Sequence, residues 1–173
     1  MRYSQIRKMD ISNGLGVGAS LFVQGCHFHC KGCFNKETWD FNGGQQYTKD
    51  TKQTIVKLLQ QPQFTRFSIL GGEPLEECNL RSLLNLIDEI KEQLPHIKIW
   101  VYTGYTYESL LARQKGQETI YLGDILAKID VLVDGQFVQE QKDIAYPFAG
   151  STNQRVIDMN KTREKGEVIL LDL

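Results

Sequence analysis

Three cysteines, Cys26, Cys30 and Cys33, lie close together in the stretch Gly-Cys-His-Phe-His-Cys-Lys-Gly-Cys-Phe-Asn, with the spacing C-x3-C-x2-C. Thiolates are soft ligands that select iron–sulfur clusters or zinc over hard cations. Three thiolates can hold three irons of a four-iron cluster and leave the fourth iron open to a substrate or cofactor. The spacing therefore favours a [4Fe-4S] cluster bound by Cys26, Cys30 and Cys33.

Other interpretations of the three cysteines stay open at this point. His27 or His29 could act as the fourth ligand of a zinc site, although both are more often hydrogen-bonded loop residues. The cysteines could also form disulfides, or pack as small buried side chains. The remaining cysteine, Cys78, is distant in sequence, and we expect it to be a structural or incidental thiol.

The composition is that of an ordinary globular protein. The chain has 173 residues, a formal net charge of -1 and 41% hydrophobic residues. These values predict a single domain spanning residues 1–173 and give no reason to expect a nucleic-acid partner. The longest apolar runs are too short to span a bilayer, and the N-terminus lacks the apolar core of a signal peptide. We therefore expect a cytoplasmic protein with reduced thiols and no membrane partner.

Buried strands alternate with amphipathic helices along the chain. This alternation predicts an α/β fold with a parallel sheet built from right-handed βαβ units. Strands are expected at residues 3–10 (an edge strand), 20–24, 67–70, 97–102 and 129–133, and a last one at 167–171. Helices are expected at residues 50–60, 79–94 with Asn79 as N-cap, 107–113 and 123–128, whereas residues 161–165 are expected to form a surface loop.

Polar and glycine-rich motifs follow the predicted core strands. They are the cysteine loop, Gly71-Gly72-Glu73, Thr103-Gly104 and Asp134-Gly135. In parallel sheets, ligands bind outside the carboxyl ends of the strands. These four motifs are therefore expected to form one composite site.

The motif after residues 67–70 suits an amino-acid ligand. Gly71 and Gly72 lack a Cβ and would let a ligand approach the backbone, while Glu73 could accept hydrogen bonds from an ammonium group. The same residues could instead form a tight strand-to-helix turn whose exit is set by Pro74. Both interpretations stay open on the sequence alone.

The motifs after the next two strands are less specific. Thr103 could offer its hydroxyl to a ribose or a carboxylate, and Asp134 could aim a carboxylate into the site. Each could equally belong to an ordinary turn. Phe28 and Phe34 flank the cysteines and could shield a cluster from water, which would tune its potential, or simply anchor the loop.

Taken together, the motifs resemble the radical S-adenosylmethionine superfamily, and within it the activating enzymes of anaerobic (class III) ribonucleoside-triphosphate reductase. The cysteine motif after the first core strand and Gly-Gly-Glu-Pro after the second carry the wider resemblance. The resemblance covers nearly the whole chain. The narrower one rests on Asn13-Gly14, on residues 21–26, on residues 33–39, and on residues 131–137 followed by Gly-Ser-Thr-Asn-Gln-Arg at 150–155.

The resemblance implies a reaction. A [4Fe-4S] cluster on the three cysteines would deliver one electron to S-adenosylmethionine and yield methionine and a 5′-deoxyadenosyl radical. That radical would take a hydrogen atom from a glycine loop of the large reductase subunit and leave a glycyl radical. A small protein such as flavodoxin would supply the electron.

The resemblance also implies the fold and the cofactor-binding residues. The chain is short for a complete barrel, so a truncated, open (β/α) barrel is expected, with its open side serving the reductase. The cofactor-binding set would be Gly32, Cys33, Phe34, Gly71, Gly72, Glu73 and Thr103.

One position departs from the pattern of the superfamily. Many members have an aromatic residue just before the third cysteine, where this chain has Gly32. Phe34 or Phe28 would then replace the missing contact on the adenine side. The alternatives are an activating enzyme for another glycyl radical enzyme, a small-molecule radical enzyme, or a non-catalytic zinc-binding interaction module.

Overall fold

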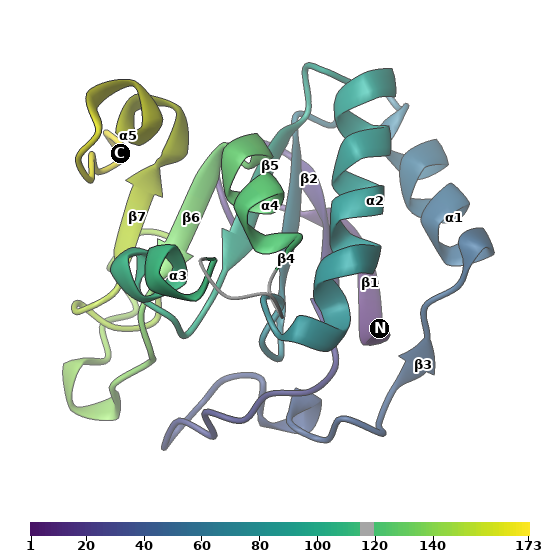
Figure 1. Ribbon diagram of the computed structural model, residues 1–173. Coiled ribbons are helices and arrows are strands. Elements are labelled where there is room, and N and C mark those ends of the chain that lie inside the picture. Colours follow the sequence, from purple (N-terminus) through teal and green to yellow (C-terminus); the bar gives the residue numbers. More distant parts are fainter. Residues whose placement is uncertain (115–119) are drawn as a thin grey trace.

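The computed structural model describes residues 1–114 and 120–173 and shows a seven-stranded sheet with helices packed against it (Figure 1). The strand order is β3-β1-β2-β4-β5-β6-β7. The strands are β1 (Arg2–Asp10), β2 (Gly18–Val23), β3 (Gln45–Gln46), β4 (Arg66–Gly71), β5 (Lys98–Tyr102), β6 (Val131–Asp134) and β7 (Arg155–Asp158). The helices are α1 (Lys49–Leu59), α2 (Glu77–Gln93), α3 (Tyr107–Arg113), α4 (Leu122–Lys128) and α5 (Met159–Lys165), with 3-10 turns η1 (Lys36–Thr38) and η3 (Gln139–Gln141).

The predicted α/β fold is confirmed, and its parallel sheet is confirmed for the four central strands. Strands β2, β4, β5 and β6 pair in parallel, whereas β1 pairs antiparallel with β2 and β7 antiparallel with β6. The turn between β1 and β2 explains the first exception, because a parallel pair needs a much longer crossover connection. The sheet is open, and its description as a truncated (β/α) barrel stays a prediction.

The helices bury one face of the sheet. Apolar residues of α1, α2 and α4 form one core with alternate residues of the central strands, such as Leu21 and Ile69. Neighbouring residues in each strand, such as Phe22 and Leu70, point to the opposite face, as the period of a strand requires. The cysteine loop extends from the end of the sheet at which β2 ends (Figure 1). Among the described residues, no helix is long and apolar enough to cross a membrane.

Three local predictions were wrong. Helix α2 begins at Glu77, and Asn79 lies inside its first turn, where its side-chain amide donates to the Glu73 carbonyl at 3.1 Å instead of capping the helix. Residues 161–165 belong to α5, which the Asp158 side chain caps and which buries Met159 and Thr162. Residues 167–171 do not form a regular strand, although they pair with β7 through a bridge at Leu170 and through two backbone hydrogen bonds.

At the start of β4, a buried arginine holds the glycine-rich turn between β1 and β2. The Arg66 side chain is fully buried and donates to the carbonyls of Asp10 at 2.6 Å, Asn13 at 2.6 Å and Leu15 at 3.3 Å. Its guanidinium also donates to Ser68 Oγ at 2.5 Å. One side chain thus satisfies several carbonyls of a turn that has no regular structure of its own.

Asp10 supplies the opposite charge. Its carboxylate lies 3.6 Å from Arg66 Nη2 and accepts hydrogen bonds from the Ser12 and Asn13 amides and the Ser20 hydroxyl. Burial raises the pKa of Asp10, but the hydrogen bonds, led by that from Ser20, outweigh burial and lower the pKa to about 2. The pair is therefore charged at neutral pH.

Arg66→Ala is expected to lower the free energy of unfolding by about 3 kcal/mol, because it removes the buried ion-pair partner of Asp10 and leaves several carbonyls without their donor. Urea unfolding followed by circular dichroism measures this change. Arg81→Ala, which removes an exposed arginine from α2, is the matched control. Equal unfolding midpoints for the two variants would contradict the assigned role of Arg66.

Candidate functional site

The three cysteines lie on the loop that follows β2, and their thiols line one cavity of about 420 Å³. The Cys26 amide donates to the Trp39 carbonyl at 3.1 Å, which joins the two ends of the loop, and inside the loop the Cys33 amide donates to the Cys30 carbonyl at 3.1 Å. The three thiols are half-buried, whereas Cys78 is exposed and lies outside the cavity lining. The structure thus brings together the three predicted ligands and leaves out the fourth cysteine.

Backbone N–H groups approach all three sulfur atoms. Burial raises the pKa of Cys26 to about 11, while the amides of Phe28 and His29 oppose this shift. Burial also raises the pKa of Cys30. The Asn35 amide donates to Cys33 Sγ at 3.4 Å. Such donors stabilise thiolates, and a metal supplies the charge that removes the protons, so the donor set fits an iron–sulfur cluster.

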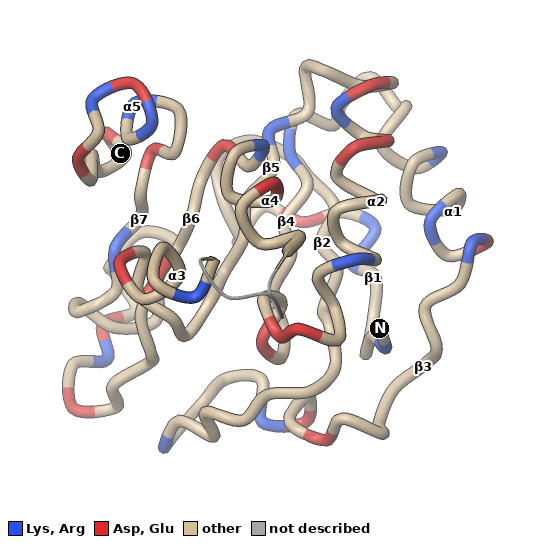
Figure 2. The backbone as a smooth tube through the Cα atoms, in the orientation of Figure 1, with Lys and Arg blue, Asp and Glu red and all other residues tan. Residues whose placement is uncertain are grey.

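Both histidines of the loop are engaged with other side chains. The His27 ring pairs through Nδ1 with the carboxylate of Glu76, in the acidic loop that leads into α2 (Figure 2). The His29 ring stacks on Trp39 with a centroid separation of 4.4 Å. Within residues 1–114 and 120–173, no three His, Cys, Asp or Glu side chains converge closely enough to hold a single metal ion.

The turn after β4 packs directly against the start of the cysteine loop. The Gly72 amide donates to the Val23 carbonyl at 2.8 Å, and the Glu73 amide to the Gly25 carbonyl at 2.8 Å. A Cβ on Gly72 would lie 2.4 Å from the Gly25 oxygen, and Gly71 has φ of +102°. The glycine pair is therefore required by chain packing, and it also lines the cavity. The interpretation of this motif as a tight turn is confirmed, and its binding of an amino-acid ligand stays a prediction.

Glu73 lines the cavity but is only 1% exposed. Its Oε1 accepts from the Leu75 amide at 2.9 Å and the Thr103 hydroxyl at 2.8 Å, and its Oε2 accepts from the Gly104 amide at 2.7 Å. Burial raises the pKa of Glu73 to about 7, although these three donors oppose the shift. The carboxylate thus ties the turn after β4 to the turn after β5.

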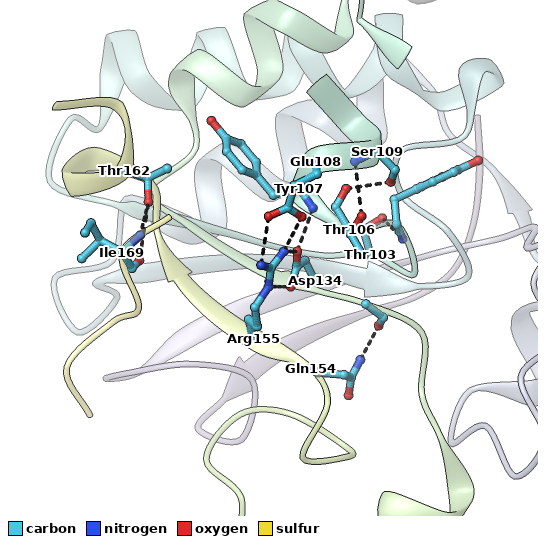
Figure 3. A network of polar contacts seen from close by, with 12 residues as sticks. Thr103, Thr106, Tyr107, Glu108, Ser109, Asp134, Gln154, Arg155, Thr162 and Ile169 are labelled. Atoms are coloured by element: carbon cyan, nitrogen blue, oxygen red, sulfur yellow. Dashed lines mark hydrogen bonds and ion pairs between the residues drawn. The ribbon is translucent and has the colours of Figure 1, made fainter. Parts of the chain in front are cut away.

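Thr103 lines the cavity, as predicted, but its hydroxyl is used inside the protein. It donates to Glu73, and its oxygen accepts from the Tyr105 amide at 3.2 Å. Asp134 is 1% exposed and pairs with Arg155, and its carboxylate accepts from the Tyr107 amide at 2.7 Å (Figure 3). Gly135 lines the cavity, but Asp134 does not. The Asp134 carboxylate therefore stabilises the fold through Arg155 and Tyr107 and does not face the cavity.

Phe28 and Phe34 of the cysteine loop both line the cavity. Phe28 packs edge-on against Tyr105 with a centroid separation of 4.8 Å, and Phe34, which is 57% exposed, packs edge-on against Phe137 at 5.2 Å. Gly32 is exposed, lies beside the Gln139 side chain and is not part of the cavity lining. Phe28 and Phe34 therefore present aromatic surface to the cavity, and position 32 does not.

Part of the cavity lining comes from the C-terminal half of the chain, and the residue types alone did not predict it. Gln136, Phe137, Gly150 and Gln154 all line the cavity. They belong to two segments, residues 131–137 and 150–155, and only the resemblance had drawn attention to these four residues. No hydrophobic periodicity marks these residues as part of a site, because they lie in loops. Contacts with residues distant in sequence determine their positions.

The fold and the cavity agree with the comparison to known families. A family model described as "4Fe-4S single cluster domain" matches residues 12–157. The class of protein is therefore that of iron–sulfur proteins with one four-iron cluster domain.

Curated relatives define the family more closely. Anaerobic ribonucleoside-triphosphate reductase-activating proteins from Escherichia coli strain K12 and Vibrio cholerae are 40% and 38% identical, over 90% and 89% of this chain and 97% and 96% of theirs. The protein of the same name from Enterobacteria phage T4 is 31% identical over 90% of this chain and 93% of its own length. The chain belongs to the family of anaerobic ribonucleoside-triphosphate reductase-activating proteins, which confirms the resemblance.

Cys30→Ala is expected to abolish cluster binding, because two thiolates are too few to hold a four-iron cluster. Iron content and visible absorption after anaerobic reconstitution measure the loss. Cys78→Ala, which removes the exposed thiol outside the cavity, should keep full iron content. A brown Cys30→Ala protein with the iron content of the unaltered chain would remove Cys30 from the ligand set.

Proposed function

We propose that this protein cleaves S-adenosylmethionine reductively at a [4Fe-4S] cluster and thereby generates a glycyl radical on an anaerobic ribonucleoside-triphosphate reductase. The observation that carries the proposal is that three cysteine thiols and the turn at residues 71–73 line the same cavity. The names and extensive coverage of the relatives support the same reaction.

The cysteine loop would hold the cluster through Cys26, Cys30 and Cys33, which leaves one iron without a protein thiolate. When bound, the cluster supplies the electron that breaks the sulfonium bond of S-adenosylmethionine. Phe28 and Phe34 would limit water access on the two sides of the loop, since both line the cavity.

The turns after β4 and β5 would hold the methionine end of S-adenosylmethionine. Gly71 and Gly72 offer backbone close to the cavity, and Thr103 and Glu73 set the position of that backbone. An ammonium group beside Glu73 would also favour the charged form of its carboxylate. Gly32, Cys33 and Phe34 are proposed to border the cofactor from the other side.

The partner is proposed to be the large subunit of the reductase, whose glycine loop must reach the cavity. A truncated, open barrel formed by a single radical S-adenosylmethionine domain, residues 1–173, would leave room for that loop. A small electron donor such as flavodoxin would reduce the cluster.

The proposed function is tested by electron paramagnetic resonance of the anaerobically reconstituted, reduced protein. Adding S-adenosylmethionine should change the [4Fe-4S]⁺ signal, because the cofactor binds the open iron. Adding the large reductase subunit should then produce a glycyl radical signal, and Cys30→Ala should produce none. A cluster signal indifferent to the cofactor would contradict cofactor binding. A changed signal with no radical on this subunit would point to another glycyl radical enzyme as the partner.

Glu73→Ala is expected to weaken S-adenosylmethionine binding by about tenfold, which corresponds to about 1.4 kcal/mol, while iron content stays unchanged. The reason is that the turns after β4 and β5 lose the carboxylate that joins them. Equilibrium binding measured by the cofactor-induced change of the cluster signal provides the affinity. Glu77→Ala, at an exposed position in the first turn of α2, is the control. Equal affinity in both variants would reduce Glu73 to a residue of the turn alone.

A further inference from the structure

The segment at residues 150–155 bonds to the backbone of the loop at residues 135–138, and we call these the bracing segment and the sulfur-facing loop. Gln154 Nε2 donates to the Gly135 carbonyl at 2.8 Å, and Asn153 Nδ2 donates to the Gln136 carbonyl at 2.9 Å. The Val138 amide donates to Ser151 Oγ at 3.1 Å. Three side chains of one segment thus fix three backbone groups of the other.

The bracing segment is itself held in one shape. Gln154 Oε1 accepts from the Gly150 amide at 2.8 Å and from the Ser151 amide at 3.2 Å. At its end, Arg155 pairs with Asp134 and donates to Glu108 of α3 at 2.7 Å (Figure 3). Because Gln154 closes the segment on itself and Arg155 ties its end to β6 and α3, the segment can fix the position of the loop that it contacts.

The sulfur-facing loop lies against a cluster ligand. The backbone N–H of Phe137 donates to the Cys30 sulfur, and Gln136 Oε1 lies 3.9 Å from Cys30 Sγ. An iron-bound thiolate can only accept hydrogen bonds, so in the loaded site the Gln136 amide would turn its NH₂ group to the sulfur. The Phe137 ring also packs close to Gly150, where a Cβ would lie 2.9 Å from it.

We propose that the bracing segment is a positioning element that holds the sulfur-facing loop against Cys30 and thereby sets the reduction potential of the cluster. This assigns a role to the Gly-Ser-Thr-Asn-Gln-Arg sequence. Asn153 lies outside the cavity lining and acts only through the loop, whereas Gln154 lines the cavity and is assigned its effect through its bond to the Gly135 carbonyl. The inference rests on the cluster of the proposed function, and does not require that S-adenosylmethionine be cleaved.

The direction of the effect follows from charge. Reduction adds an electron to the cluster, and hydrogen bonds to its sulfur ligands stabilise the more negative state. When the loop is no longer held, these bonds lengthen and the cluster becomes harder to reduce. The midpoint potential is then expected to become more negative.

The test is a redox titration of the reconstituted protein, without S-adenosylmethionine or reductase, followed by the [4Fe-4S]⁺ signal. Gln154→Ala removes three hydrogen bonds and is expected to disfavour reduction about tenfold, which equals 59 mV for a one-electron couple. Asn153→Ala removes the bond to Gln136 and should shift the potential in the same direction by less. Thr152→Ala is the control, because its side chain lies exposed in the same segment. Within residues 1–114 and 120–173, Thr152 bonds through its backbone amide alone, to the Gln141 carbonyl at 2.9 Å.

Unchanged potentials in Gln154→Ala and Asn153→Ala, at full iron content, would overturn the proposal. A shift of equal size in Thr152→Ala would also overturn it, since it would reflect a general disturbance of the segment. If Gln154→Ala fails to hold iron, Asn153→Ala decides the question, because Asn153 is exposed and makes fewer bonds. If the [4Fe-4S]⁺ signal of the wild-type protein did not change on adding S-adenosylmethionine, the proposed function would be contradicted. The comparison of reduction potentials among the variants would still hold, because it is made without S-adenosylmethionine.

Discussion

A buried carboxylate governs the arrangement of this cavity. A carboxylate removed from water is costly unless hydrogen-bond donors surround it. Glu73 meets that requirement with donors from its own turn and from the turn after β5, so the two turns must stay at a fixed separation. Asn79 adds a bond from α2 to the Glu73 carbonyl, and the Glu73 amide bonds to Gly25 just before the first cysteine. The sheet, a helix and the cysteine loop therefore meet at one residue.

Strand β4 has a buried ionisable side chain near each of its ends. Arg66, at its start, is satisfied by Asp10 and by carbonyls of the turn between β1 and β2. Glu73 lies just beyond its other end, at the cavity. Arg66 holds the turn at the end of the sheet that has no cysteine loop, and Glu73 holds the turns at the end that has it. Between these two ionisable side chains, Phe67 and Ile69 of the strand are apolar and belong to the core that the helices cover.

The predicted cluster ligands and the residues that surround them come from different parts of the chain. All three cysteines belong to one short loop after β2, yet the Cys30 sulfur accepts a hydrogen bond from Phe137, which follows β6. Phe137 in turn packs against Phe34 of the cysteine loop. The predicted iron ligands thus come from one short loop. The hydrogen bonds to their sulfur atoms, in contrast, depend in part on a loop that follows a distant strand of the sheet.

Local chemistry explains what the sequence alone determined. Thiolate softness and the spacing of Cys26, Cys30 and Cys33 point to a four-iron cluster, and the alternation of apolar strands with amphipathic helices specifies the parallel central sheet. The turn motifs after the strands could also be placed at one edge of the sheet, because parallel strands end there together. The pattern could not reveal β7 or α5, since short polar segments are stabilised by their neighbours.

Only the tertiary structure decided where the polar side chains point. The sequence left Asp134 free to face either the cavity or a turn, and a distant residue, Arg155, determines that it is buried in an ion pair. Thr103 likewise turns its hydroxyl to Glu73 because a buried carboxylate needs a donor there. The physical reason is common to both: the identity of a residue is local, but its hydrogen-bond partner is chosen by whichever distant strand or loop lies next to it in the folded chain.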